Sequence, residues 1–335
     1  MMNVGLSYPY FGDREDSADP ARQSVEPHWA ATLDHMVWAE ELGFDSIWLG
    51  EHHFEKDHLP SPLLLAAALA MRTSRVRMCG WMLAPLYHPV RLAEECAMVS
   101  VLSHGRIDLG TGMGHFPLEF EALGVNIKHR PSLLEETVEI CRRAWTGKPF
   151  SFEGKRYTIP EVTITPVPAQ QPRVLIAASA EPAVRRAARI GDGFLANNFD
   201  GIDVYVDELE RLGKSGVIYS GQNGIVVEDP ERFIAEESRY AVGYCNDLID
   251  RNYLQRAYYE NIQDAIEEGV YVVRDAATAI KELDELARSY PLMEGVSFMV
   301  TSGPGEPLDA TSERIQYFAD RVLPELHDIR SAATT

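Results

Sequence analysis

The sequence predicts an α/β protein built as a parallel (β/α)8 TIM barrel, with an insertion in the C-terminal half. Apolar strand-like runs alternate with helical patterns, and about eight such units follow one another without a visible reversal of strand order. A doubly wound sheet also alternates strands with helices, but this number of regular units favours the barrel. We expect a single domain over residues 1–335, with irregular insertions at about 147–172 and 213–270.

Strands are expected where short apolar runs are bounded by turn residues. They are Val4–Tyr8, Ser46–Leu49, Val76–Leu83, Arg106–Gly110, Val174–Ala178, Gly193–Asn197, Tyr240–Tyr244 and Gly295–Val300. Helices are expected where apolar residues recur at helical spacing, often with Ser or Pro at the start and Gly at the end. They are His28–Leu42, Pro62–Arg72, Pro89–Leu102, Leu133–Trp145, Pro182–Ile190, Ile202–Leu212, Ala276–Ser289 and Ser312–Leu323, the last stopped by Pro324.

Three stretches interrupt this alternation. The first, rich in Pro and Gly, spans Gly147–Pro172 and contains SFEGKRYTI, which predicts a small hairpin outside the main repeat. Gly213–Glu228 is Gly-rich and predicts no regular element. Asn246–Gly269 is polar and is expected to be helical.

The composition narrows the class of protein. The chain carries 31 basic and 51 acidic residues, a formal net charge of −20, which argues against binding to nucleic acid or to anionic membranes. No run of 18 apolar residues and no signal-peptide pattern is present. Four widely spaced cysteines without a CxxC pair are typical of reduced, buried thiols. We therefore expect a cytoplasmic small-molecule enzyme.

Chemistry in such barrels is carried by residues that follow the strands. Glu51, His52 and His53 follow the second expected strand, and because neighbouring strand residues alternate in direction, only one histidine should face the site. That histidine could transfer a proton near neutral pH. The alternative is a loop histidine bonded only to the backbone. No HExxH pattern occurs and adjacent histidines rarely share a metal, so no metal is expected.

Two further strand ends carry small residues. Gly110–Gly114 has three alternating glycines, which permit close approach of a ligand, although His115 breaks the dinucleotide fingerprint and a simple tight turn is the alternative. Ala178–Glu181 leads into a helix whose first amides could bind a phosphate, unless Ser179 is only an N-cap. Gly80–Met82 brings apolar groups that could line a flat cofactor or belong to the core.

Several long segments resemble the bacterial luciferase-like flavin monooxygenases. They are WAEELGFDSIWLGEHHF, LAPLYHPVRLAEECAMVSVLSHGRIDLGTGMG, FEALG and PVPAQQPRVLIAASAEPAVRRAARIGDGFLANN. The resemblance runs from the first strand to about residue 198 and returns at Val322–Leu326, whereas residues 200–290 match only loosely. The EHHF and HPVRLAE blocks together make it specific.

The resemblance implies an enzyme that uses reduced FMN and O2 to oxygenate a small organic, uncharged or aromatic substrate. It also implies a separate NAD(P)H:flavin reductase as the source of reduced FMN. The alternatives are a deazaflavin-dependent oxidoreductase of the same superfamily and a non-catalytic flavin-binding partner subunit. A homodimer is implied as well, joined through apolar helices within Pro62–Met71 and Leu92–Leu102. Deep packing of these helices against the barrel is the alternative.

The resemblance also assigns roles to individual residues. By position, His52 matches the catalytic histidine, with Glu51 to position it, and Gly80–Trp81 matches a non-prolyl cis peptide against the flavin ring. Luciferase has a phosphate-binding arginine where this chain has Met113, and Arg130 is the hypothetical substitute. The implied cofactor-binding residues are Gly80, Trp81, Met82, Thr111, Gly112, Ala178, Ser179, Ala180, Glu181 and Arg130. The implied substrate-binding residues are Tyr8, Tyr10, His53, His115 and Phe116.

Overall fold

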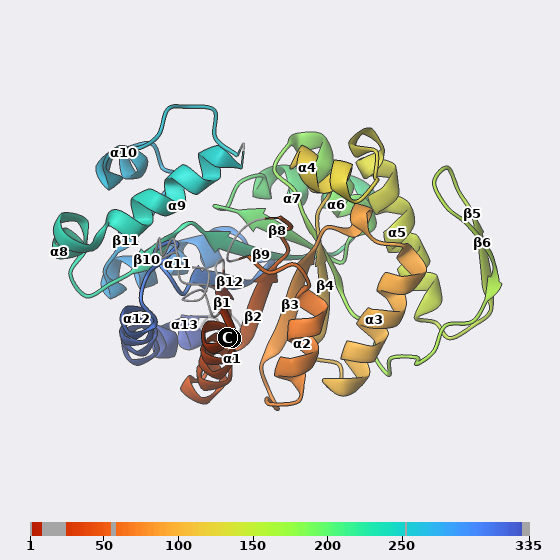
Figure 1. Ribbon diagram of the computed structural model, residues 1–335, viewed down its shortest axis with the longest axis horizontal. Helices are drawn as coiled ribbons and strands as arrows, with labels where there is room; N and C mark the ends of the chain where they lie inside the picture. Colours follow the sequence, from red (N-terminus) through yellow and green to blue (C-terminus); the bar gives the residue numbers. More distant parts are fainter. Residues whose placement is uncertain (1, 9–24, 55–57, 252, 330–335) are drawn as a thin grey trace. The chain divides into compact units, whose positions relative to one another are not determined.

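Eight parallel strands form a closed barrel in the order β1–β12–β9–β8–β7–β4–β3–β2 (Figure 1). This computed structural model describes residues 2–8, 25–54, 58–251 and 253–329. The barrel strands are β1 (Asn3–Tyr8), β2 (Ser46–Gly50), β3 (Arg77–Met82), β4 (Ile107–Thr111), β7 (Val174–Ala177), β8 (Gly193–Asn197), β9 (Val217–Gln222) and β12 (Met293–Met299). The (β/α)8 barrel predicted from the sequence is confirmed.

Helices separate the strands along the chain. They are α1 (Val25–Leu42), α2 (Pro62–Ala70), α3 (Pro89–Leu102), α4 (Pro117–Ala122), α5 (Arg130–Ala144), α6 (Glu181–Ile190), α7 (Ile202–Leu212), α8 (Pro230–Arg232), α9 (Arg239–Asp250), α10 (Ile262–Glu267), α11 (Ala276–Ser289), α12 (Leu308–Arg321) and α13 (Leu323–Ile329). Short 3-10 turns η2 (Ala84–Leu86) and η3 (Ile127–His129) and a π-helical turn η4 (Phe233–Glu237) complete them. Pro occupies the first turn of α2, α3, α4, α5 and α6, where its missing amide hydrogen costs nothing.

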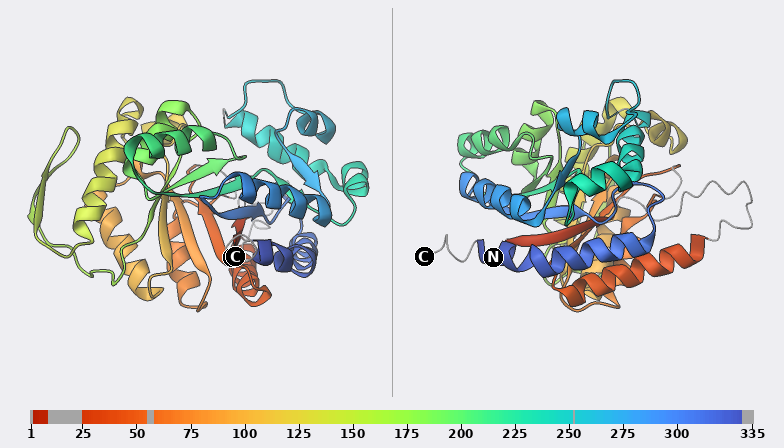
Figure 2. Two further views of the ribbon diagram at one scale, coloured as in Figure 1. Left: turned by 180° about the vertical axis from the view of Figure 1, so that it is seen from behind. Right: turned by 90° about the vertical axis from the view of Figure 1, so that its left-hand side faces the viewer.

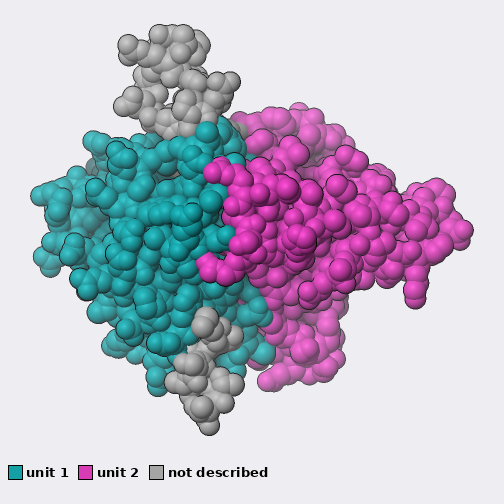
Figure 3. Space-filling view, turned by 90° about the horizontal axis from the view of Figure 1, so that it is seen from below, with its two compact units in different colours: residues 1–48, 55–59, 219–335 teal, residues 49–54, 60–218 magenta. Residues whose placement is uncertain are grey.

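The chain divides into two compact units, which Figure 3 shows in different colours. The first comprises residues 1–48, 55–59 and 219–335, and the second comprises residues 49–54 and 60–218. The single domain predicted from the sequence stays a prediction. Each unit is described by itself below.

In the second unit, helices pack on the outer side of β3 and β4, where α2 contacts β3 and α3 contacts both β4 and α5 (Figure 1). Cys96 and Cys141 are fully buried in this layer, and Trp145 Nε1 donates a hydrogen bond to the carbonyl oxygen of Ala93 at 3.0 Å. All four cysteines of the chain are buried and unbonded. Among the described residues, no helix combines the length and the apolarity needed to cross a membrane.

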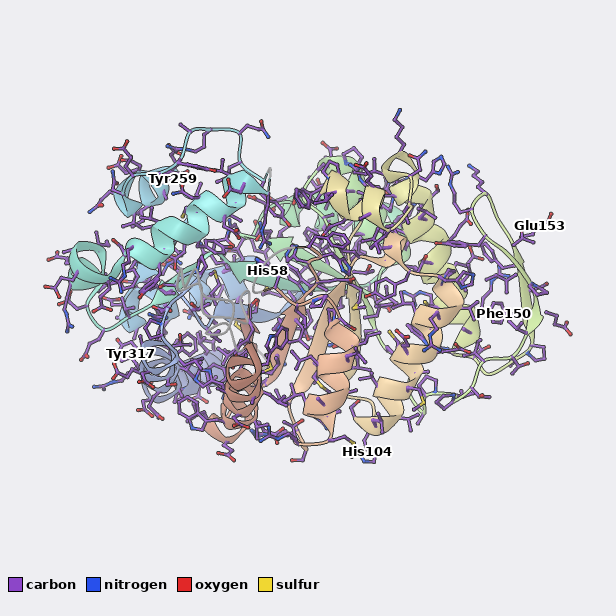
Figure 4. The ribbon with its side chains drawn as sticks, in the orientation of Figure 1. His58, His104, Phe150, Glu153, Tyr259 and Tyr317 are labelled. Atoms are coloured by element: carbon purple, nitrogen blue, oxygen red, sulfur yellow. The ribbon has the colours of Figure 1, made fainter. Side chains whose placement is uncertain are left out.

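A hairpin leaves the barrel after α5, as the sequence predicts. Strands β5 (Phe150–Glu153) and β6 (Thr158–Val162) pair antiparallel and stand beyond α5 in Figure 2, and Figure 4 labels Phe150 and Glu153 on β5. Phe152 and Ile159 pack on Ile140 of α5. The Glu136 carboxylate accepts the three successive amides of residues 155–157 at 2.8–3.1 Å, which fixes the turn.

The first unit contains β1 paired with β12 and a small parallel ribbon of β10 (Gly224–Val226) and β11 (Val272–Arg274). Its own apolar cluster includes Phe233, Tyr244 and Tyr271. The buried carboxylate of Glu306 pairs with the buried guanidinium of Arg314 at 2.6 Å, which compensates the cost of desolvating both charges.

Three features of the second half differ from the prediction. The prediction of a strand at Tyr240–Tyr244 is wrong, because these residues lie inside α9, where Ala241, Tyr244 and Cys245 are buried at helical spacing. The barrel strand is instead β9, which lies in the Gly-rich stretch that predicts no element and within the range expected as the second insertion. The helix α12 ends at Arg321, and Pro324 does not stop it but sits in the first turn of a further helix, α13.

A buried carboxylate joins β4 to both of its neighbouring segments in the second unit. Asp108 Oδ1 accepts Arg77 Nη2 at 2.7 Å, and Asp108 Oδ2 accepts Arg173 Nη2 at 2.8 Å. Burial raises the pKa of Asp108, but the hydrogen bonds and charges of Arg173 and Arg77 outweigh it, so the pKa lies below its usual value. The carboxylate therefore stabilises the folded protein only while it is ionised.

We predict that Asp108→Asn lowers the free energy of unfolding by about 2 kcal/mol, because it removes the buried negative charge with which two partly buried guanidinium groups pair. A folded-state pKa below the unfolded value of about 3.9 means that the stabilisation is complete above that pH and is lost as the pH falls through the folded pKa. Urea denaturation at pH 7 and below pH 4 measures both effects. Glu95→Gln, which breaks the exposed pair with Arg91, is the control and should change little. Equal losses in both variants would contradict the prediction.

Candidate active site

A buried carboxylate, Glu51, organises the polypeptide just after β2. Its side chain is inaccessible to solvent and accepts three hydrogen bonds, from His53 Nε2 at 2.7 Å, from the amide of Leu83 at 2.7 Å and from Tyr87 Oη at 2.8 Å. The amide of Glu51 itself donates to the carbonyl oxygen of Trp81 at 3.1 Å. Glu51 thus ties the end of β2 to the end of β3 and to the loop before α3.

The electrostatics of this cluster favour a charged imidazole. The hydrogen bond from Glu51 raises the pKa of His53, against the opposing effect of burial, and the charges of Glu51 and Glu119 raise it further. Burial, with the neighbouring charge of Glu51, raises the pKa of Tyr87, so its hydroxyl keeps its proton and donates it. His53 therefore keeps its proton to a higher pH than a free histidine, and its bond to Glu51 holds the ring in one orientation.

The second histidine, His52, lies beside a different carboxylate. Its Nδ1 is 4.0 Å from Oε1 of Glu119, a buried residue in the first turn of α4, and the same oxygen accepts the backbone amide of His53 at 3.0 Å. The hydrogen bond of Glu51 to a histidine ring goes to His53, and the expectation that Glu51 positions His52 stays a prediction. The side chains of adjacent residues diverge, so Glu51 holds His53 while His52 faces Glu119.

The inner face of β3 carries Trp81. A Cβ added at Gly80 would meet Pro62 of α2 at 3.4 Å and Met82 Sδ at 3.3 Å, so these positions face the helices. By alternation, Cys79 and Trp81 face the barrel interior, and Trp81 is the last interior residue of the strand. The Met82 side chain is buried on the helix side, and a role of Met82 in cofactor binding stays a prediction. The Gly80–Trp81 peptide is trans, which corrects the expected cis bond.

At the end of β4, the side chain of Thr111 forms a hydrogen bond within the protein. Thr111 is fully buried, and its hydroxyl donates to the carbonyl oxygen of Met82 at 2.9 Å. Of the following glycines, Gly114 has φ +69° and packs on Phe120, so the fold itself requires it. A Cβ at Gly112 would meet only Ala177, at 3.6 Å, so this backbone is open to a ligand and is not needed by the packing.

The end of β7 leads directly into α6. Ala180 is the N-cap residue and its side chain makes no capping bond, so Ser179, which is exposed, is not the cap of this helix. Pro182 has no amide hydrogen, and the amides of Ala183 and Val184 donate to the carbonyl oxygen of Ala180. The Ala180 and Glu181 amides at this helix start are outside the helical hydrogen-bond pattern and can bind an anion.

Two arginines differ in how they relate to this helix start. Arg130 is the first residue of α5, where Nη1 donates to the carbonyl oxygen of Ile127 at 3.4 Å. Arg186 of α6 places Nη1 at 3.4 Å from Sδ of Met113, which follows β4. The Arg186 side chain is 16% exposed, and its Nε is paired with Glu135 at 2.8 Å.

The predicted substrate residues are only partly placed together. His115 and Phe116 follow Gly114 in the loop before α4, and both are half-buried in the second unit. Tyr8 is a buried residue of β1 in the first unit, and Tyr10 lies outside the described residues. A role of any of them in substrate binding stays a prediction.

Tyr87, Glu119 and Arg186 were not predicted as site residues from the sequence. Tyr87 directly follows the turn η2, and Glu119 lies in the first turn of α4. The sequence signal for both was only their place in a segment that follows a strand. Arg186 looks like an ordinary helix-surface cation in ARRAARI until the fold brings it to Met113.

The residues present fit a flat, phosphate-bearing cofactor. Trp81 offers an aromatic face toward the interior, Gly112 leaves its backbone open, and the start of α6 offers amides. The Arg186 guanidinium adds a cation whose Nη1 has a thioether, a weak acceptor, as its partner.

With this geometry in place, comparison with known proteins identifies the family. Residues 2–216 match the family described as luciferase-like monooxygenase. The chain belongs to this family. The resemblance seen in the sequence is thereby confirmed, and the protein is a member of a superfamily of oxidoreductases that includes both FMN-dependent and F420-dependent enzymes.

Individual relatives point in two directions. The chain is 33% identical over 217 residues to a protein named F420-dependent glucose-6-phosphate dehydrogenase from Amycolatopsis mediterranei (strain U-32), a match covering 62% of this chain and 64% of that protein. It is 25% identical to the monooxygenase RslO1 from Streptomyces bottropensis, with a TM-score of 0.78, over 96% of this chain and 99% of that chain.

A third similarity shows the fold alone. The oxygenating constituent of 3,6-diketocamphane monooxygenase from Pseudomonas putida, a type II Baeyer–Villiger monooxygenase in complex with FMN, is 19% identical, with a TM-score of 0.74, over 97% of this chain and 99% of that chain. Family membership is therefore compatible with either FMN or F420, and the choice between them depends on the residues of the site.

We predict that Glu51→Gln lowers the pKa of His53, because the amide keeps the shape of the carboxylate but removes its charge. The raised pKa of His53 means that the pair stabilises the fold below the unfolded histidine value of about 6.5 and ceases to do so as the pH rises through the folded value. NMR titration of the histidine ring protons measures the shift. Glu119→Gln is the comparison variant and should give a smaller shift, because the charge of Glu119 also raises the pKa of His53 but its hydrogen bond goes to the backbone amide and not to the ring. A larger shift in Glu119→Gln than in Glu51→Gln would contradict the assignment.

Proposed function

We propose that this protein is an FMN-dependent monooxygenase that oxygenates a small, uncharged or aromatic organic substrate. The observation that carries the proposal is the pair of adjacent histidines, each beside its own buried carboxylate, after β2. In the overall reaction, substrate, O2 and reduced FMN give oxygenated substrate, water and oxidised FMN. The similarity to a monooxygenase over nearly the whole chain also supports it.

The residues of this chain divide the work. Bound reduced FMN supplies the two electrons that O2 activation requires. Trp81 offers a flat wall to the ring system, and its position at the barrel interior excludes water from one face. His52, the residue proposed to be catalytic, donates a proton at the ring nitrogen that faces the reacting oxygen, while the bond to Glu51 orients His53 beside it.

Glu119 completes this arrangement. Its Oε1 lies 4.0 Å from His52 Nδ1, so a buried negative charge faces one edge of the imidazole that we propose to be catalytic. With Nδ1 on the side of Glu119, the other ring nitrogen is the one that would donate to the reacting oxygen.

The alternative is hydride transfer to or from a deazaflavin. The relative named F420-dependent glucose-6-phosphate dehydrogenase favours it. The same cluster would serve it too, because a protonated histidine beside a substrate hydroxyl or carbonyl group assists hydride transfer. The two functions differ in whether an atom of O2 enters the product.

We predict that the protein, given reduced FMN and a reductase under ¹⁸O2, incorporates one labelled oxygen into a neutral ketone, aldehyde or aromatic substrate. His52→Ala should lower kcat by at least about 100-fold while FMN affinity, measured by fluorescence quenching, stays unchanged. Mass spectrometry of the products detects the label. Turnover with reduced F420 and no label in the product would overturn the monooxygenase and support the alternative. Unchanged turnover in His52→Ala would remove this residue from the mechanism.

We also propose that the reduced flavin comes from a separate NAD(P)H:flavin reductase. The glycine run after β4 ends in His115, so it lacks the fingerprint that would bind a nicotinamide dinucleotide there. A net charge of −20 gives anionic FMN no long-range attraction, so delivery depends on local donors and on the concentration of reduced flavin.

A homodimer through α2 and α3 is the proposed assembly. These two helices pack on each other, yet their outer sides expose large apolar side chains, with Leu64 at 75% and Met71 at 68% exposure. Met98, Val101 and Leu102 of α3 are exposed as well. The alternative interpretation of their sequence was full burial of both helices against the barrel. The exposed apolar side chains on their outer sides differ from that expectation. Such an apolar surface favours contact with a second copy.

We predict that the double variant Leu64→Glu, Met98→Glu is a monomer by size-exclusion chromatography with light scattering, whereas the unmodified chain is a dimer. Leu123→Glu adds a charge at an exposed apolar residue after α4 and serves as the control, which should remain dimeric. An unmodified chain that is monomeric at micromolar concentration would contradict the proposed assembly.

A further inference from the structure

We propose that Arg186 is the phosphate-binding cation of the cofactor site, acting together with the amides at the start of α6 from its position beside Met113. This rests on the proposed function in one respect only, namely that the cofactor carries a phosphate ester. The ligand chemistry is a phosphate group attached to a flavin or deazaflavin side chain.

The topology brings the three parts together. Strands β4 and β7 are neighbours, with Thr111 paired to Ile176, and Gly112 lies against Ala177. Met113 continues from β4, and the α6 helix begins four residues after β7 ends, so the two segments leave the barrel side by side. Arg186, in the second turn of α6, reaches back across this space and touches Met113 Sδ at 3.4 Å.

The carboxylate that pairs with Arg186 compensates its positive charge only in part. Glu135 Oε1 accepts Arg186 Nε at 2.8 Å, but the same oxygen also accepts Arg189 Nη2 at 2.7 Å. One carboxylate is thus shared by two guanidinium groups, so the trio carries a net positive charge. The Nη1 end of Arg186 contacts a thioether, which is a weak acceptor compared with a phosphate oxygen.

The surroundings also fix the direction of the guanidinium. With an exposure of 16%, the Arg186 side chain is largely packed, and the bond to Glu135 holds its Nε end. The Nη1 end therefore points toward Met113 and the loop after β4. The neighbouring cation, Arg185, has its charge compensated by two carboxylates, those of Glu181 and of the buried Glu208.

This arrangement explains how a chain with Met113 can retain a phosphate site. The cation is carried by a helix instead of the loop after β4, and it lies next to the same methionine. It also replaces Arg130, the substitute expected from the sequence, which bonds to its own backbone turn at Ile127.

The test compares cofactor forms with and without phosphate. Dissociation constants of FMN and riboflavin are measured by fluorescence quenching for the unmodified protein and for Arg186→Met. We expect the unmodified protein to bind FMN at least about 10-fold tighter than riboflavin, and Arg186→Met to lose most of that ratio without weaker riboflavin binding. The ratio is measured on one folded population, so partial unfolding does not mimic the effect.

Two variants serve as controls. Arg189→Met removes the other partner of Glu135 without touching Met113, and it should keep the FMN to riboflavin ratio. Adding Met113→Arg to Arg186→Met places a cation at the other side of the contact and should restore the ratio in part. Arg186→Lys should retain part of it, because it keeps the charge but loses the two-nitrogen geometry.

The outcomes separate this inference from the proposed function. If F420 binds and FMN does not, the proposed cofactor is wrong, and the same ratio is measured between F420 and its phosphate-free riboside. A ratio lowered only by Arg186→Met then still supports the phosphate site. A ratio unchanged by Arg186→Met, an equal loss in Arg189→Met, or no phosphate-dependent binding of either cofactor overturns it.

Discussion

The Glu51 carboxylate is the constraint on which the rest of the site depends. A buried carboxylate with three donors is stable only if all three donors are present at once, and here they come from the residue after β2, from the amide of Leu83 after β3 and from Tyr87. The requirement fixes the ends of two strands and a loop relative to one another. The adjacent histidine ring is oriented as a consequence, and so is the mouth of the barrel beside Trp81.

A second carboxylate makes the two histidines unequal. Glu119 accepts the amide of His53, so the backbone between the histidines is held while the rings diverge. The site therefore offers one ring whose pKa is raised by its hydrogen bond to Glu51 and another whose Nδ1 lies beside Glu119. The two histidines therefore differ in environment because each lies beside a different buried carboxylate, His53 beside Glu51 and His52 beside Glu119.

Sequence alone predicted much of the frame and less of the site. The barrel, most strands and the hairpin follow from local patterns, whereas β9 is obscured by flanking glycines and Tyr240–Tyr244 combines strand-like composition with helical burial spacing. EHHF locates the histidines, but which of them Glu51 binds depends on side-chain direction after the strand. Arg186 could not be found from its sequence, because its contact with Met113 joins segments 73 residues apart.

The glycines at the end of β4 and in the loop after it differ in whether the fold would accept a side chain at their position. Gly114 has a left-handed conformation against Phe120, and Gly110 leaves no room beside Cys79, so both are bound to the fold. Gly112, by contrast, has space for a methyl group on the protein side. A side chain placed at position 112 would therefore narrow what can approach the barrel mouth without disturbing the strands beneath it, whereas one at position 110 or 114 would disturb the fold first.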